Sequence, residues 1–160
     1  MKPSSLKDIK SDLKNCSQEE LLELTLRLIR FKKDNKELIS YLLYESENDH
    51  LYIESYKEEM DEVFSQINRS SFFFIRKGVR KILSQTKKNI RYAQKKEIEI
   101  ELLLYFCKNL MEFRPSVKRN KVLMNSFETQ IRMIRKAIST MDSDLQHDYT
   151  VLLNEILDMH

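Results

Sequence analysis

Two groups of side chains have residue types and a spacing that suit metal or acid–base chemistry. His50 and Glu54 are four residues apart, so on a helix they share one face and could both bind a metal ion. Asp144, His147 and Asp148 form the second group. Neither group belongs to the repeated Glu-x-x-His pairs of di-iron bundles, and scattered polar positions on helices are normally solvated. We therefore predict no catalytic residue, no metal site and no cofactor.

Cysteine and glycine usage removes further classes of enzyme. Cys16 and Cys107 are the only cysteines and lie in no CxxC spacing, so neither a zinc site nor a disulfide framework is indicated. Phosphate-binding loops need several glycines, whereas Gly78 is alone. We predict that Gly78 is tolerated inside a helix at a cost of about 1 kcal/mol relative to Ala, in preference to serving a close helix contact. Enzyme is the least favoured class.

The stretch from Val63 to Lys96 is the most unusual part of the sequence, because it holds ten Lys or Arg residues and no Asp or Glu. At 100° per residue, its apolar side chains fall in one sector of a helix and its cations fill the opposite arc. That arc would be about 30 Å long. We call it the basic stripe, and it consists of Arg76, Lys77, Arg80, Lys81, Lys87, Lys88, Arg91 and Lys95.

The basic stripe has three interpretations. It is a solvated face neutralised by the acidic segment that precedes it, residues 45–62, or a contact for a nucleic-acid backbone, or a contact for a protein partner with an acidic face. Phe73 falls within the basic arc, but a preceding segment usually covers aromatic side chains at a helix start, so we predict core packing in preference to a stacking platform.

The elements that position these residues are expected to be helices throughout, since one Gly and two Pro leave few residues that favour tight turns. Apolar side chains recur at helical spacing in eight segments, near residues 6–13, 17–33, 38–47, 53–67, 72–92, 98–113, 123–138 and 145–156. Capping boxes begin at Ser5, Ser17 and Ser143, and Asp34–Asn35 is expected to form a turn and cap. The fold class is therefore all-α.

The helices are expected to form antiparallel hairpins within one domain, residues 1–160. A short array of the HEAT or armadillo type and a compact helical bundle both remain open. The apolar residues of segment 17–33 lie on several sides, which predicts a helix enclosed by neighbours and slightly favours the array. We also expect Glu54, Glu58 or Asp61 to pair with Arg76, Arg80 or Lys81 across one hairpin.

Two segments resemble an uncharacterised family of small helical bacterial proteins. The first lies within the first 45 residues and runs from Ser-Leu-Lys-Asp-Ile-Lys-Ser-Asp-Leu-Lys to Tyr-Leu-Leu-Tyr-Glu, and the second is Leu-Leu-Leu-Tyr-Phe-Cys. The resemblance implies a helical-repeat-like fold and transfers no site. We predict a cytoplasmic, non-enzymatic interaction module, a protein scaffold or adaptor without membrane contact. The alternative is nucleic-acid backbone binding through the basic helix around residues 72–95.

Overall fold

The computed structural model describes residues 1–160, which form eight α-helices and no β-strand. The helices are α1 (Leu6–Lys14), α2 (Gln18–Phe31), α3 (Lys33–Ser40), α4 (Asp49–Ser65), α5 (Phe72–Ala93), α6 (Lys96–Glu112), α7 (Lys121–Ile138) and α8 (Ser143–Asp158). A π-helical turn, Tyr41–Glu45, follows α3, and a 3₁₀ turn, Val117–Arg119, precedes α7. The prediction of an all-α fold with about eight helices is confirmed.

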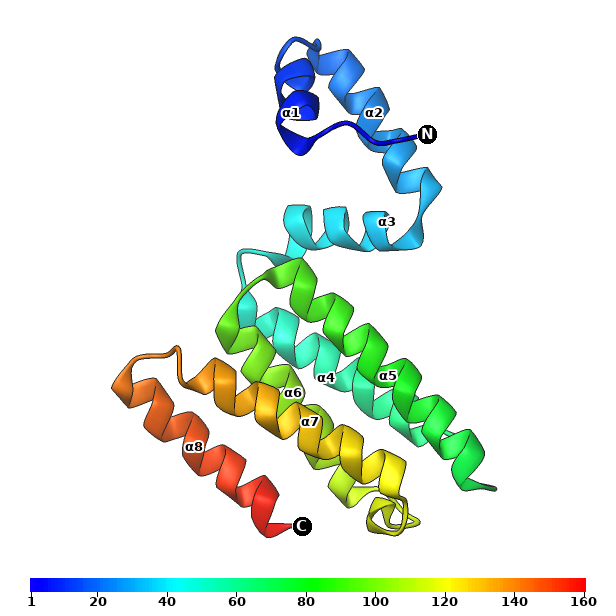
Figure 1. Ribbon diagram of the computed structural model, residues 1–160, viewed down its shortest axis with the longest axis vertical. Helices are drawn as coiled ribbons and strands as arrows, with labels where there is room; N and C mark the ends of the chain where they lie inside the picture. The colour runs from blue at the N-terminus through cyan, green and yellow to red at the C-terminus, as the bar shows by residue number, and fades with distance from the viewer. The chain divides into compact units, whose positions relative to one another are not determined.

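The chain divides into two compact units, Met1–Tyr44 with α1 to α3 and Glu45–His160 with α4 to α8 (Figure 1). The assignment of residues 1–160 to a single domain stays a prediction. None of the helices combines the length and the apolar character needed to cross a bilayer.

Helix starts follow the capping chemistry of the sequence in two of the three predicted places. The Ser5 hydroxyl accepts a hydrogen bond from the Asp8 backbone N–H at 3.2 Å. The Ser17 hydroxyl accepts one from the Glu20 N–H at 3.1 Å. At the third place the cap is Asp142 and not Ser143, because the Asp142 carboxylate accepts from the Leu145 N–H at 3.0 Å. An ionised cap also interacts favourably with the positive end of the helix.

The junction of α2 and α3 lies earlier than the predicted turn at Asp34–Asn35. The chain is extended at Lys32, with φ −147° and ψ 136°, and α3 already begins at Lys33. Asn35 lies in the first turn of α3, where its side-chain amide donates to the Leu28 carbonyl at 2.7 Å. It therefore satisfies one of the free carbonyls at the end of α2 and caps no N-terminus.

The second unit is a bundle around α6, which packs against α4, α5, α7 and α8. This helix buries nine residues, including the consecutive Leu102, Leu103 and Leu104. A helix with apolar residues on all sides needs neighbours on all sides. In an array each repeat contacts only the next, so of the two arrangements left open by the sequence the second unit matches the compact bundle.

The helix enclosed by neighbours is therefore α6, and the prediction that segment 17–33 has this position is wrong for the isolated chain. None of α1, α2 and α3 contains a buried residue. Leu22 and Leu28 of α2 are exposed by 57% and 60%. Periodicity identified the apolar surface of α2 correctly, but the chain supplies no cover for much of it.

Candidate functional site

The basic stripe faces outward because the opposite face of α5 is fixed in the bundle. Ile75, Val79, Ile82 and Thr86 are spaced by four, three and four residues, and all four are buried between α5 and its neighbours α4 and α6. The cations lie on the remaining arc. The apolar sector expected from the sequence is thus the face that packs.

Hydrogen bonds to α4 fix the rotation of α5. The Tyr56 and Thr86 hydroxyls lie 3.0 Å apart in the buried interface. The Tyr52 hydroxyl is 2.9 Å from the Asn89 side-chain oxygen and 3.0 Å from its backbone carbonyl oxygen. Partner positions rise along α4 as they fall along α5, so the two helices are antiparallel, as expected. A buried polar contact of this kind penalises any rotation that would leave it unpaired.

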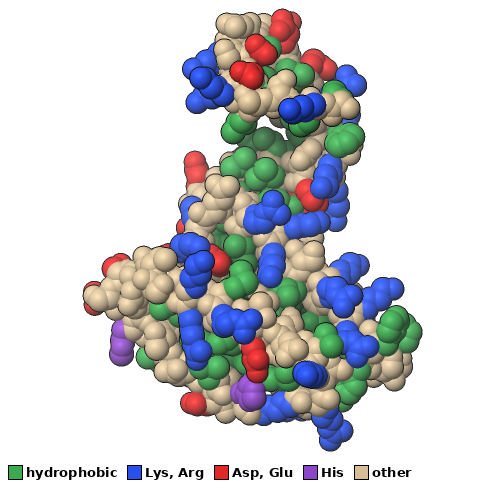
Figure 2. Space-filling view, in the orientation of Figure 1, with side chains coloured by type: hydrophobic (Ala, Val, Ile, Leu, Met, Phe, Trp, Pro, Cys, Tyr) green, Lys and Arg blue, Asp and Glu red, His purple; other side chains and the backbone are tan.

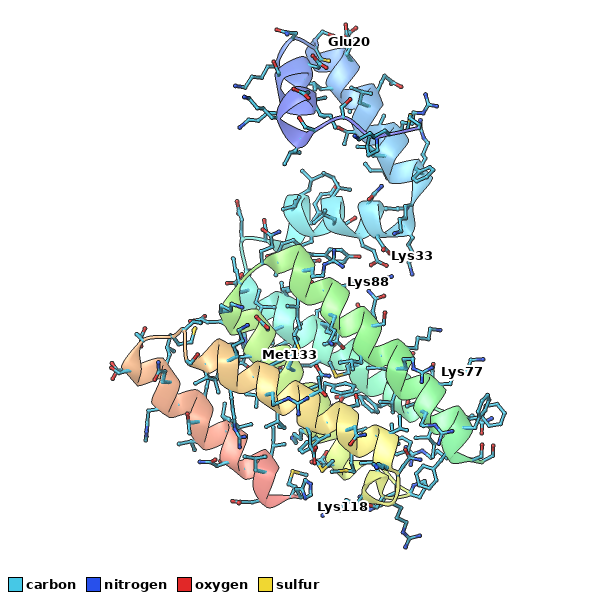
Figure 3. All side chains as sticks on the ribbon, in the orientation of Figure 1. Glu20, Lys33, Lys77, Lys88, Lys118 and Met133 are labelled. Atoms are coloured by element: carbon cyan, nitrogen blue, oxygen red, sulfur yellow. The ribbon has the colours of Figure 1, made fainter.

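The eight side chains of the basic stripe differ in exposure. Lys77, Arg80, Lys81, Arg91 and Lys95 are exposed, whereas Arg76, Lys87 and Lys88 are half-buried. Figure 2 shows Lys and Arg side chains along α5 with few acidic side chains among them. Figure 3 shows Lys77 and Lys88 well separated along α5, which corresponds to about three helical turns. The stripe is therefore a row of positive charge.

The three carboxylates of α4 that were expected to neutralise this row, Glu54, Glu58 and Asp61, do not pair with α5, so these predicted pairs are wrong. Asp61 accepts hydrogen bonds from the Tyr105 hydroxyl at 2.7 Å and from the Asn109 amide at 3.2 Å, both on α6. Glu54 pairs with Lys57 at 3.1 Å, and Glu58 has no ion pair. At 100° per residue these carboxylates lie outside the sector of α4 that holds Tyr52 and Tyr56, which contact α5.

The contact with Asp61 also changes Tyr105. Burial, with the hydrogen bond to Asp61 as the next cause, raises the pKa of its phenol to about 12. Tyr105 therefore stays protonated and keeps donating to Asp61 at neutral pH. This carboxylate is part of the α4–α6 packing and is not a counter-ion for the basic stripe.

Most of the basic stripe has no carboxylate partner. Lys95 pairs with Asp49 at 2.7 Å, next to the end of α5. Six other members form no ion pair, namely Arg76, Lys77, Arg80, Lys81, Lys87 and Arg91. The interpretation of an idle face neutralised by the acidic segment loses its main support, because the structure does not contain the expected counter-charges on these six cations.

The aromatic residues at the start of α5 contradict the prediction that Phe73 packs in the core. Phe73 is 62% exposed and Phe74 42% exposed, so Phe73 is not a core residue. Their rings meet edge to face, with centroids 5.3 Å apart and planes at 80°. Three consecutive helical residues span 200° and cannot all face one core. That geometry was available in the sequence and is the signal that the prediction underweighted.

Gly78 lies at a close contact between α5 and the turn that precedes it. The sequence had favoured a glycine that is merely tolerated inside the helix. A Cβ atom at this position would be 2.9 Å from Cγ1 of Ile67 and 3.2 Å from its Cγ2. Ile67 is 9% exposed and belongs to the turn between α4 and α5. The absence of a side chain at Gly78 lets this turn pack directly on α5.

The remaining candidate groups do not come together. His50 and His147 are both exposed, and no three or more His, Cys, Asp and Glu side chains are positioned to hold a metal ion. Burial raises the pKa of the Cys107 thiol to about 12, which leaves it a protonated core residue at neutral pH. Cys16 is half-buried, and its thiol pKa is also raised, by partial burial and then by Glu20.

Comparison with known proteins found no family model, no curated protein and no solved structure that matches this chain. The resemblance of its first 45 residues to small helical bacterial proteins stays a prediction.

Proposed function

We propose that this chain is a non-enzymatic interaction module and that its basic stripe binds a nucleic-acid backbone. The observation that supports the proposal is the row of six cations without carboxylate partners on one face of α5. A row of phosphates requires cations of suitable spacing and imposes little else on the protein surface. The net charge of the chain is only +3, so the attraction is local to this helix.

The exposed pair Phe73 and Phe74 favours a single-stranded ligand over an acidic protein partner. Phe73 falls on the same helical arc as Lys77 and Arg80. Unpaired bases stack on aromatic side chains while cations follow the phosphates, and this combination is common to surfaces that bind single strands without sequence preference. An acidic protein would use the cations but would gain less from an exposed aromatic pair.

The test is a fluorescence-anisotropy titration of the full chain with a labelled oligothymidine of about 20 nucleotides, at several salt concentrations. Log affinity should fall with log salt by about 0.7 for each phosphate contacted by a single strand. The triple variant Arg80→Glu, Lys87→Glu, Arg91→Glu should lose most of the binding and lower the salt slope by about 2. Its circular dichroism should match wild type, because surface substitutions typically cost within about 0.5 kcal/mol each.

A matched control separates a local surface from a general effect of charge. Arg132→Glu, Arg135→Glu, Lys136→Glu makes the same change in net charge on exposed positions of α7. This control should retain most of the affinity. Equal losses in the two triple variants, or no binding by wild type at low salt, would remove nucleic acid and leave an acidic protein partner as the ligand to be sought by comparing wild type with the α5 variant.

A further inference from the structure

One face of α2 carries an apolar strip that its own unit leaves partly exposed. Leu21, Leu24, Leu28 and Phe31 are spaced by three, four and three residues, so they lie along one side of the helix. Their exposed fractions are 38%, 45%, 60% and 83%. α2 packs against α3, and none of the three helices of this unit has a buried residue. A strip of this periodicity is what one helix presents to another.

Charges beside the strip are separated along the helix by sign. Glu20 and Glu23 lie in its first half, and Arg27 and Arg30 lie in its second half. These four side chains line one open groove together with Leu24, and Glu20 lies near the start of the helix (Figure 3). None of the four forms an ion pair within the chain. By contrast, Lys32 and Lys33 beyond the helix are paired with Asp34 and Glu37.

The spacing of these charges identifies the partner. Positions 20 and 30 are equally distant from Thr25, and so are positions 23 and 27. A second α2 running antiparallel, with a two-fold axis near Thr25, therefore brings Glu20 to Arg30 and Glu23 to Arg27 on the other copy. In an antiparallel helix pair the same edge of each helix meets itself, so each charged edge meets its complement and each apolar strip meets the other strip.

We propose that two copies of this chain associate through α2, antiparallel and centred near Thr25. The interface is self-complementary in both shape and charge, as a two-fold contact requires. The helix is about 20 Å long, so the buried area is below the standard of about 800 Å² per partner and the dimer is weak. Association is reversible on dilution and concerns a different surface from the basic stripe.

Sedimentation velocity on the full chain tests the proposal directly. The mass should rise with concentration from 19.3 kDa toward twice that value at about 100 µM. Glu20→Arg with Glu23→Arg makes the groove wholly basic, and Arg27→Glu with Arg30→Glu makes it wholly acidic. Each variant alone should self-associate at least about tenfold more weakly, because like charges then meet across the axis. An equimolar mixture of the two should associate again, as a heterodimer.

The mixture also protects the test against misfolding, since two unfolded variants would not restore a dimer. Glu58→Arg with Glu155→Arg is the matched control, because it makes the same charge change at exposed positions outside α2 and should leave association unchanged. A wild type that stays monomeric up to about 100 µM overturns the proposal. Variants that associate like wild type, or a mixture that stays monomeric, overturn it equally.

Cross-linking tests the antiparallel orientation. In a Cys16→Ser background, Leu24→Cys should form a disulfide-linked dimer under mild oxidation, because two copies of position 24 lie about 3 Å apart along the common axis. Two copies of position 31 lie about 18 Å apart, so Phe31→Cys should cross-link far more slowly. Equal rates for the two variants would indicate a parallel or disordered contact and would refute the model.

Discussion

Replacing Gly78 with Ala tests the packing between α5 and the turn that precedes it. The substitution removes a helix-interior glycine, which by itself stabilises by about 1 kcal/mol. The added methyl group, however, would lie 2.9, 3.2 and 3.3 Å from three side-chain atoms of Ile67. Ile67 is β-branched and buried, so it cannot turn to an alternative rotamer without cost.

Whether Gly78→Ala stabilises or destabilises the protein depends on which is larger, the gain in helix propensity or the cost of crowding Ile67. Forcing an extra carbon into a packed site costs about 1–3 kcal/mol, and a contact with a stiff side chain belongs in the middle of that range. We therefore expect Gly78→Ala to destabilise the protein by about 1 kcal/mol net. For a chain of this size the melting temperature should fall by about 2–4 °C. Urea unfolding followed by circular dichroism at 222 nm measures the change.

A double-mutant cycle isolates the contact from the helix propensity. Ile67→Ala removes all three crowding atoms, so in that background Gly78→Ala should stabilise by about 1 kcal/mol, which makes the coupling about 2 kcal/mol. The Ala-minus-Gly difference at the exposed Ser84 of α5 gives the propensity term without the contact. If Gly78→Ala stabilises the wild-type protein as much as this reference, the packing argument is wrong.

Two further outcomes concern other side chains. Phe73→Ala should weaken oligothymidine binding by about 5- to 160-fold, since one stacked base contributes about 1–3 kcal/mol. Folding should stay near wild type because the ring is 62% exposed. An unchanged affinity would mean that only the cations of this surface bind the ligand. At pH 8 a thiol with a pKa of about 12 is only about one part in 10⁴ thiolate, so Cys107 should react with a thiol reagent only on unfolding. The half-buried Cys16 should react in the native state. Equal reaction rates of the two thiols in the native protein would contradict the burial of Cys107.

Local features of the fold could be predicted from the sequence because their causes are local. The apolar sector of α5, the caps at Ser5 and Ser17 and the end of α5 near Tyr92 each depend on residues within a turn or two. α5 ends at Ala93, and Gln94 then adopts φ 53° with no Gly to announce it. The sequence predicted the end of this helix near residue 92 without a Gly or Pro to mark it.

Features that depend on distant partners were predicted poorly. Asp61 was expected opposite the basic stripe, yet its partners Tyr105 and Asn109 lie more than forty positions away on α6. Consecutive helices of opposite charge suggested the pairing, and helix rotation prevented it. Rotation is set by the buried contact of Tyr56 with Thr86, which no charge pattern reveals. Five residues of the basic stripe are exposed, as its position on the outer arc of the helix suggested, but the absence of ion pairs at Arg76, Lys77, Arg80, Lys81, Lys87 and Arg91 was not predicted.

A comparison of α2 with α6 shows that an apolar helix face identified in the sequence need not be buried by the same chain. Both helices carry leucines on several sides, and the chain covers those of α6 completely while leaving Leu24 and Leu28 of α2 45% and 60% exposed. Burying a large aliphatic side chain fully is worth about 1.5–3 kcal/mol, so a strip of four exposed residues leaves several kcal/mol unused. A random exposed strip would have no reason to carry charges that mirror each other about one residue. The strip on α2 does carry them, and for this reason we assign its cover to a second copy of the same chain.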